Sequence, residues 1–103
     1  KYSQPTTITT LSNEIPDKFS LSQNYPNPFN PSTIINYQLT INSNVILKVY
    51  NNLGNEVEVL VNEKQNAGSY SVTFNGGNLP SGIYFYKLEA GEFKETKKMI
   101  LIK

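Results

Sequence analysis

Residues 45–61 read VILKVYNNLGNEVEVLV, and their alternating pattern indicates the class of fold. Residues 45–50 carry valine or leucine at every second position, and residues 56–61 alternate valine with glutamate until Leu60 interrupts the pattern. Successive side chains of a β-strand point to opposite faces, so a period of two predicts two half-buried strands. Gly54 lies in the polar stretch between them and can adopt the positive φ of a tight reversal. We therefore predict a β-hairpin with its valines on the buried face and both glutamates on the solvated face.

The same alternation appears on both sides of this hairpin. Further strands are expected at residues 33–41, 70–74, 83–89 and 93–102. The first of these places four large apolar side chains on one face: Ile35, Tyr37, Leu39 and Ile41. No window shows a capped helical repeat, and short strands at roughly ten-residue spacing are typical of antiparallel sandwiches. The sequence thus predicts an all-β fold, an antiparallel immunoglobulin-like β-sandwich of about seven strands.

Tyr84 occupies a position that matters in such folds. It follows the loop of residues 75–82 and begins the penultimate expected strand. In immunoglobulin-type sandwiches a tyrosine at this corner donates a hydrogen bond to backbone a few residues upstream. We predict that role for Tyr84, the alternative being simple packing of an aromatic ring in the core.

The N-terminal part of the chain has a different character. Residues 1–18 mix threonines with Pro5 and Pro16 and hold only isolated aliphatic residues, so we expect a linker here and a folded domain over residues 19–103. Pairing of an edge strand around Ile8 and Leu11 is the alternative for part of this segment.

A proline-punctuated stretch, NYPNPFNP, occupies residues 24–31. Its prolines exclude a helix and favour extended backbone, while Tyr25 and Phe29 offer apolar side chains that can hold the segment on a core. We expect an ordered loop leading into a strand. The alternative is an extended ligand for an aromatic groove.

The composition argues against an enzyme. The chain has no His, Cys, Trp or Arg, and Asp17 is its only aspartate. The usual general base, thiolate nucleophile and His or Cys metal site are therefore missing. No cofactor site is indicated, and a calcium site is only weakly supported because acidic residues are scattered.

Charge and aromatic content limit the possible ligands. The formal net charge is +1, and the lysines do not form the clustered basic face of a nucleic-acid binder. No apolar stretch approaches the ~20 residues of a membrane helix. Three tyrosines are candidates for a platform on which sugars stack, with core packing as the favoured alternative: Tyr50, Tyr84 and Tyr86.

Four motifs carry a family resemblance by their order along the chain. They are NYPNPFNPST (24–33), LGNEV (53–57), LPSGIYFY (79–86) and the final TKKMILIK (96–103). Together they resemble the C-terminal sorting domain of the type IX secretion system, in its type A form, over residues 19–103. Each motif is weak alone, and the combination is specific.

The resemblance implies a function in secretion. A covalently linked N-terminal passenger would reach the periplasm, and the domain would direct it through the type IX translocon to the cell surface or the medium. A sortase-like protease would then cut within or before residues 1–18. The residues implied in recognition by the translocon and the protease are Pro80, Gly82, Tyr84, Lys97, Lys98 and Lys103.

The last strand is expected to take part in that recognition. At a sheet edge it would offer unpaired backbone groups to a receptor by strand addition, with Lys97 and Lys103 on one face and Lys98 on the other. The same free edge makes an edge-strand dimer possible. The competing interpretation is an immunoglobulin-like accessory or carbohydrate-binding module of a secreted enzyme. A sorting domain has to end its protein, as Lys103 is expected to do, whereas an accessory module can lie anywhere.

Overall fold

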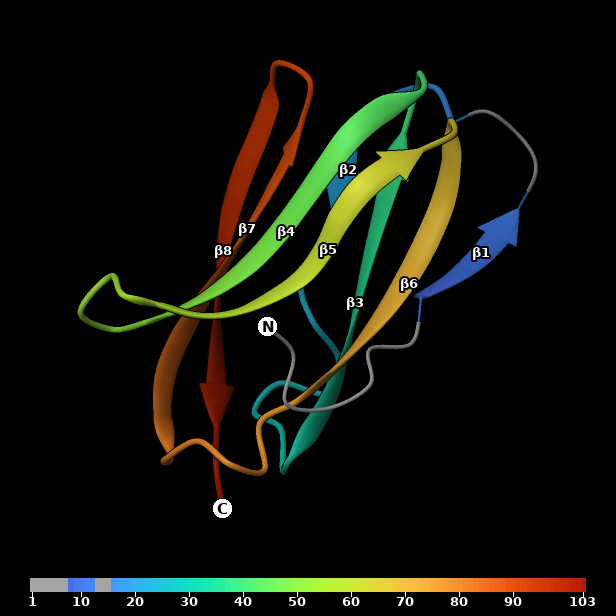
Figure 1. Ribbon diagram of the computed structural model, residues 1–103. Helices are drawn as coiled ribbons and strands as arrows, with labels where there is room; N and C mark the ends of the chain where they lie inside the picture. The colour runs from blue at the N-terminus through green and yellow to red at the C-terminus, as the bar shows by residue number, and fades with distance from the viewer. Residues whose placement is uncertain (1–7, 13–15) are drawn as a thin grey trace.

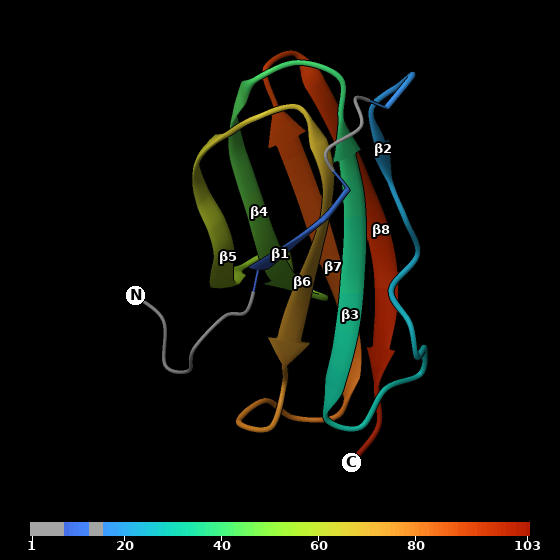
Figure 2. The same ribbon diagram turned by 90° about the vertical axis from the view of Figure 1, so that its right-hand side faces the viewer.

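A computed structural model describes residues 8–12 and 16–103 as two antiparallel sheets packed face to face (Figure 1). One sheet contains, in spatial order, β1 (Ile8–Ser12), β6 (Gly68–Asn75), β3 (Ser32–Leu39) and β2 (Ser20–Leu21). The other contains β5 (Glu56–Gln65), β4 (Ser43–Asn51), β7 (Gly82–Ala90) and β8 (Phe93–Leu101). In the view turned by 90°, the first sheet lies in front of the second (Figure 2).

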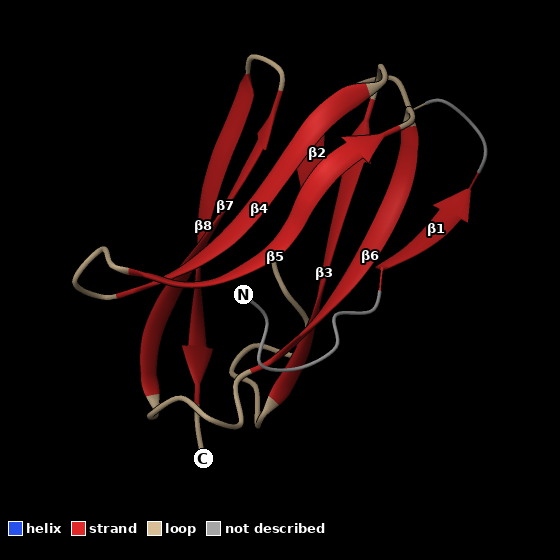
Figure 3. Ribbon diagram, in the orientation of Figure 1, coloured by secondary structure: helices blue, strands red, loops and turns tan. Residues whose placement is uncertain are grey.

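The regular structure of the described residues consists of strands alone (Figure 3). This confirms the predicted all-β sandwich. The described part of the chain contains no helix long and apolar enough to cross a membrane.

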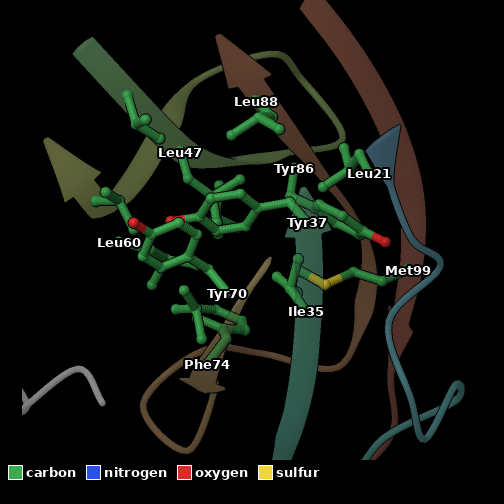
Figure 4. Packing of buried hydrophobic residues seen from close by; sticks show 14 of the residues in the cluster. Leu21, Ile35, Tyr37, Leu47, Leu60, Tyr70, Phe74, Tyr86, Leu88 and Met99 are labelled. Atoms are coloured by element: carbon green, nitrogen blue, oxygen red, sulfur yellow. The ribbon is translucent and has the colours of Figure 1, made fainter. Parts of the chain in front are cut away.

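Alternating side chains of both sheets meet in one core (Figure 4). Tyr37 and Tyr70, directly opposite each other on β3 and β6, stack with ring centroids 5.4 Å apart. The Tyr37 hydroxyl donates a 2.6 Å hydrogen bond to Oε1 of the buried Gln65 on β5. The core therefore satisfies its polar groups while the sheets interdigitate.

Strand β3 is shorter than predicted. Ile35, Tyr37 and Leu39 are buried as expected, but Ile41 is 62% exposed. The strand ends at Leu39 and the chain turns into β4 at Ser43, so the alternation does not reach Ile41. The prediction for Ile41 was wrong.

Strand β5 also departs from the sequence pattern. The pairing with β4 shifts register twice, so Glu58 lies opposite Val49 and Glu56 opposite Tyr50. Residues opposite each other in an antiparallel pair share a face, so Glu58 is on the core side, where burial raises its pKa. Glu56 is on the outer face and forms a 3.1 Å ion pair with Lys48. The predicted shared face of the two glutamates was wrong, because bulges insert extra residues into the strand.

Part of the expected linker belongs to the sandwich. Strand β1 pairs with β6, with Ile8 opposite Val72, which is the alternative considered for this segment. Ile8 is partly buried and packs against the core. The remaining linker residues at 1–7 and 13–15 lie outside the described residues.

The proline-rich stretch is an ordered loop that joins the two sheets. Tyr25 forms an isolated bridge with Ile34 of β3, and Phe29 forms one with Leu101 of β8. The Tyr86 hydroxyl accepts a 2.8 Å hydrogen bond from the Asn24 N–H and donates one of 2.7 Å to the Ser22 carbonyl. Of the two aromatic side chains expected to hold the segment on the core, Phe29 is 1% exposed and does so, whereas Tyr25 is 79% exposed and does not.

Candidate functional site

Four of the six predicted recognition residues lie at one end of the sandwich. There the C-terminus passes the loop that joins β6 to β7 (Figure 1). Pro80, Gly82 and Tyr84 come from this loop and the first residues of β7, and Lys103 reaches the loop from beyond the end of β8. The other two, Lys97 and Lys98, lie farther back along β8.

Tyr84 forms the predicted corner. Its hydroxyl donates a 2.7 Å hydrogen bond to the Pro80 carbonyl, and its ring is buried. Burial raises the pKa of this hydroxyl, which therefore stays protonated as a donor. Between them, Gly82 has a φ of 155°, a backbone region that residues with a side chain rarely adopt. The upstream bond expected of an immunoglobulin-type tyrosine is confirmed.

Replacing Tyr84 with phenylalanine is expected to lower the free energy of unfolding by about 1 kcal/mol, because the ring stays but the bond to Pro80 is lost. Urea unfolding followed by circular dichroism measures this loss. Tyr50→Phe is the matched control, since no hydrogen bond joins the Tyr50 hydroxyl to any other described residue; it should change stability by less than about 0.5 kcal/mol. Equal losses in the two variants would contradict a structural role for the corner.

Lys103 is bound by the loop. Its Nζ donates hydrogen bonds to the carbonyls of Gly77 at 2.6 Å and Leu79 at 3.0 Å. Its backbone N–H donates to Oγ of Ser81 at 3.0 Å. The ammonium thus fixes the path of residues 77–81, where two carbonyl dipoles stabilise its charge.

Lys97 and Lys98 have different surroundings. Lys97 lies on the same side of β8 as Met99 and forms a 3.1 Å ion pair with Glu95. Lys98 is exposed on the outer face, in register with Phe85 of β7, and has no ion-pair partner within the described ranges. Of the three predicted lysines, Lys98 has the charge that is most available to a partner.

A cavity of about 270 Å³ opens beside the corner. Its walls are the corner residues on one side and the β4–β5 turn on the other, which projects sideways in Figure 1. It is lined by Asn51, Asn52, Val57, Leu79, Pro80, Ser81, Gly82, Ile83 and Tyr84. The motifs LGNEV and LPSGIYFY are separate in the sequence, which gives no sign that the fold brings Val57 of the first beside the second.

The comparison with known families identifies the domain. A family profile described as the secretion system C-terminal sorting domain matches residues 23–103. The chain belongs to this family. A search of curated proteins found no match. The chain is thus a sorting signal of type IX secretion, for export to the cell surface or the medium, and its family is not one of enzymes.

The last strand of the sorting domain is less open than the sequence suggested. Asn27 Oδ1 accepts from the Ile100 N–H, and Gln23 Nε2 donates to the Lys98 carbonyl. The Phe29 N–H donates a 2.9 Å hydrogen bond to the Ile100 carbonyl, and the Phe29 carbonyl accepts one of 2.9 Å from the Ile102 N–H. The C-terminal half of the edge is therefore occupied within the domain, and the expectation of a wholly free edge was wrong. The outward backbone groups of Lys94 and Thr96 and the Lys98 N–H have no such partner within the described part of the chain.

The sorting domain does not display the aromatic platform considered for sugars. Tyr84 is 4% exposed and Tyr86 is fully buried, with its hydroxyl bonded to the proline-rich loop. Tyr50 alone lies on the outer face, opposite Phe85. Core packing is therefore the correct reading of Tyr84 and Tyr86.

Proposed function

We propose that this sorting domain carries a covalently linked N-terminal passenger through the periplasm and across the outer membrane by the type IX translocon. A sortase-like protease then separates the two within or before residues 1–18. The passenger reaches the cell surface or the medium.

The observation that carries this proposal is the family match over residues 23–103, which includes six of the eight strands, β3 to β8, and both walls of the cavity. The architecture supports it. A sorting signal must present the same surface whatever passenger precedes it, and a sandwich with its own hydrophobic core can do so. Four of the six candidate recognition residues, Pro80, Gly82, Tyr84 and Lys103, come from the end of the domain where the C-terminus passes the β6–β7 loop (Figure 1).

Two kinds of recognition residue are proposed. Pro80, Gly82 and Tyr84 set the shape of the corner, since their contacts are within the domain. Lys98 offers a free positive charge to the machinery, and Lys103 holds the loop beside the corner. Lys97 is proposed as a secondary contact because Glu95 partly neutralises it.

A fusion assay tests the proposal. Residues 1–103 are fused behind a reporter with a signal for export to the periplasm, in a bacterium that has the type IX system. The fusion should appear outside the outer membrane, and a reporter without the domain should stay in the periplasm. A fusion that folds but remains periplasmic would refute the proposal.

The lysines make separate predictions in that assay. Lys98→Ala should reduce export several-fold without changing thermal stability, because an exposed charge mainly raises the rate of association with a partner. Lys64→Ala is a matched control, since Lys64 is also exposed but lies on β5. Lys103→Ala should reduce export and also speed amide hydrogen exchange in residues 77–81. Unchanged export with Lys98 and Lys103 both replaced in a folded domain would exclude recognition through these lysines.

A further inference from the structure

The cavity between the β4–β5 turn and the corner has a size suited to one side chain. Cavities that hold drug-sized ligands measure about 300–1,000 Å³. This one measures about 270 Å³ and opens to the surface. Hot-spot side chains at protein interfaces fill pockets of this kind, and they are enriched in Trp, Tyr and Arg.

The residues that line the cavity disfavour a charged side chain in it. Among the described residues, none of those that line the cavity is charged, and Val57, Leu79 and Ile83 give it aliphatic walls. A buried charge without a partner is costly, so an arginine, lysine or carboxylate would lose its hydration here without compensation. An uncharged aromatic or large aliphatic side chain would instead gain from burial.

Most of the polar atoms around the cavity already form hydrogen bonds within the domain. The Leu79 carbonyl and the Ser81 hydroxyl accept from Lys103, and the Pro80 carbonyl accepts from Tyr84. Asn51 Oδ1 accepts from two backbone N–H groups of its own turn. Asn52 differs, since its exposed side-chain amide has no hydrogen bond to any other described residue. It can bond the backbone of a segment whose side chain enters the cavity.

We propose that this cavity receives one uncharged apolar side chain, aromatic by preference, from a protein component of the type IX machinery. Asn52 bonds the backbone beside that side chain. The inference rests on the proposed function and specifies its partner chemistry. In this account Lys103 is a positioning residue, because it fixes the loop that forms one wall.

Filling the cavity tests the proposal in the export assay. Val57→Phe places a ring in the cavity and should reduce export several-fold. Val59→Phe is its matched control: it makes the same change on β5, but Val59 lies opposite Lys48 and does not line the cavity. Asn52→Phe, with Asn62→Phe as control, repeats the test at exposed positions where folding is not at risk. Normal export of folded Val57→Phe and Asn52→Phe would overturn the proposal.

A titration of the isolated domain tests which kind of side chain the cavity binds, and it does not depend on secretion. The chain of residues 1–103 is titrated with N-acetyl-phenylalanine amide, which is uncharged, and with N-acetyl-aspartate amide, which is an anion. The first should shift the amide NMR signals of residues 79–84, and the second should not. Equal effects, or no shifts with the uncharged probe, would overturn the proposal. If the unaltered fusion is not exported, the proposed function fails, and this titration alone decides whether the cavity binds apolar side chains.

Discussion

Replacing Phe29 with alanine is expected to lower the free energy of unfolding by about 3–5 kcal/mol, the usual cost of removing a large buried ring. Phe29 is 1% exposed and packs edge-on against Phe74, with centroids 6.0 Å apart. Its ring also lies beside Gly76, where an added Cβ would be 3.5 Å from Cε2 of Phe29. The backbone bonds of Phe29 to β8 depend on this placement, so the variant should also release the C-terminal half of the β8 edge.

Tyr25→Ala is the matched control for Phe29→Ala. It removes an aromatic ring from the same segment, but Tyr25 is 79% exposed. We expect a change of less than about 0.5 kcal/mol. Urea unfolding followed by circular dichroism measures both variants, and hydrogen exchange at Ile100 and Ile102 reports release of the edge. Similar losses in the two variants would contradict the role given to Phe29.

Stability is expected to fall steeply at alkaline pH. Burial raises the pKa of Tyr86 to about 12 and raises that of Tyr37 further, while the pKa values of Tyr70 and Tyr84 also move up for the same reason. Above the ordinary tyrosine pKa of about 10 the unfolded chain loses these protons and the folded chain keeps them. The free energy of unfolding then decreases by up to about 1.4 kcal/mol per pH unit for each such tyrosine.

The stability supplied by these tyrosines is complete below about pH 10 and is lost as the pH rises toward their folded values. Urea midpoints between about pH 8 and about pH 11.5 measure the slope. Tyr86→Phe removes one titrating group and should flatten the alkaline slope, although it lowers stability at neutral pH through the lost bonds to Asn24 and Ser22. An alkaline slope unchanged in this variant would contradict the assignment.

Periodicity predicted most of the sandwich, because alternation directly records which face of a strand is buried. Val45, Leu47 and Val49 are all in the core, and Tyr84 makes the upstream bond expected at its corner. The errors lie where local pattern and tertiary pairing diverge. Two register shifts turn Glu58 inward, and only Leu60, which interrupts the alternation, marked the irregularity in the sequence.

The candidate site was predictable only in part. Local motifs pointed to Pro80, Gly82 and Tyr84, but no local signal shows that Asn52 and Val57 complete a cavity with them. That contact depends on how β4 pairs with both β5 and β7. Nor could the sequence show that Phe29 and Asn27 bond the outer edge of β8, since these residues are more than seventy positions away from Ile100.

We propose that this domain alone is sufficient as a sorting signal for type IX secretion. The most direct measurement is the fraction of a periplasm-targeted reporter fused to residues 1–103 that appears outside the outer membrane, with the translocon intact and with it inactivated. The account predicts export in the first strain and retention in the periplasm in the second. Retention in both, or export that does not depend on the translocon, would contradict it.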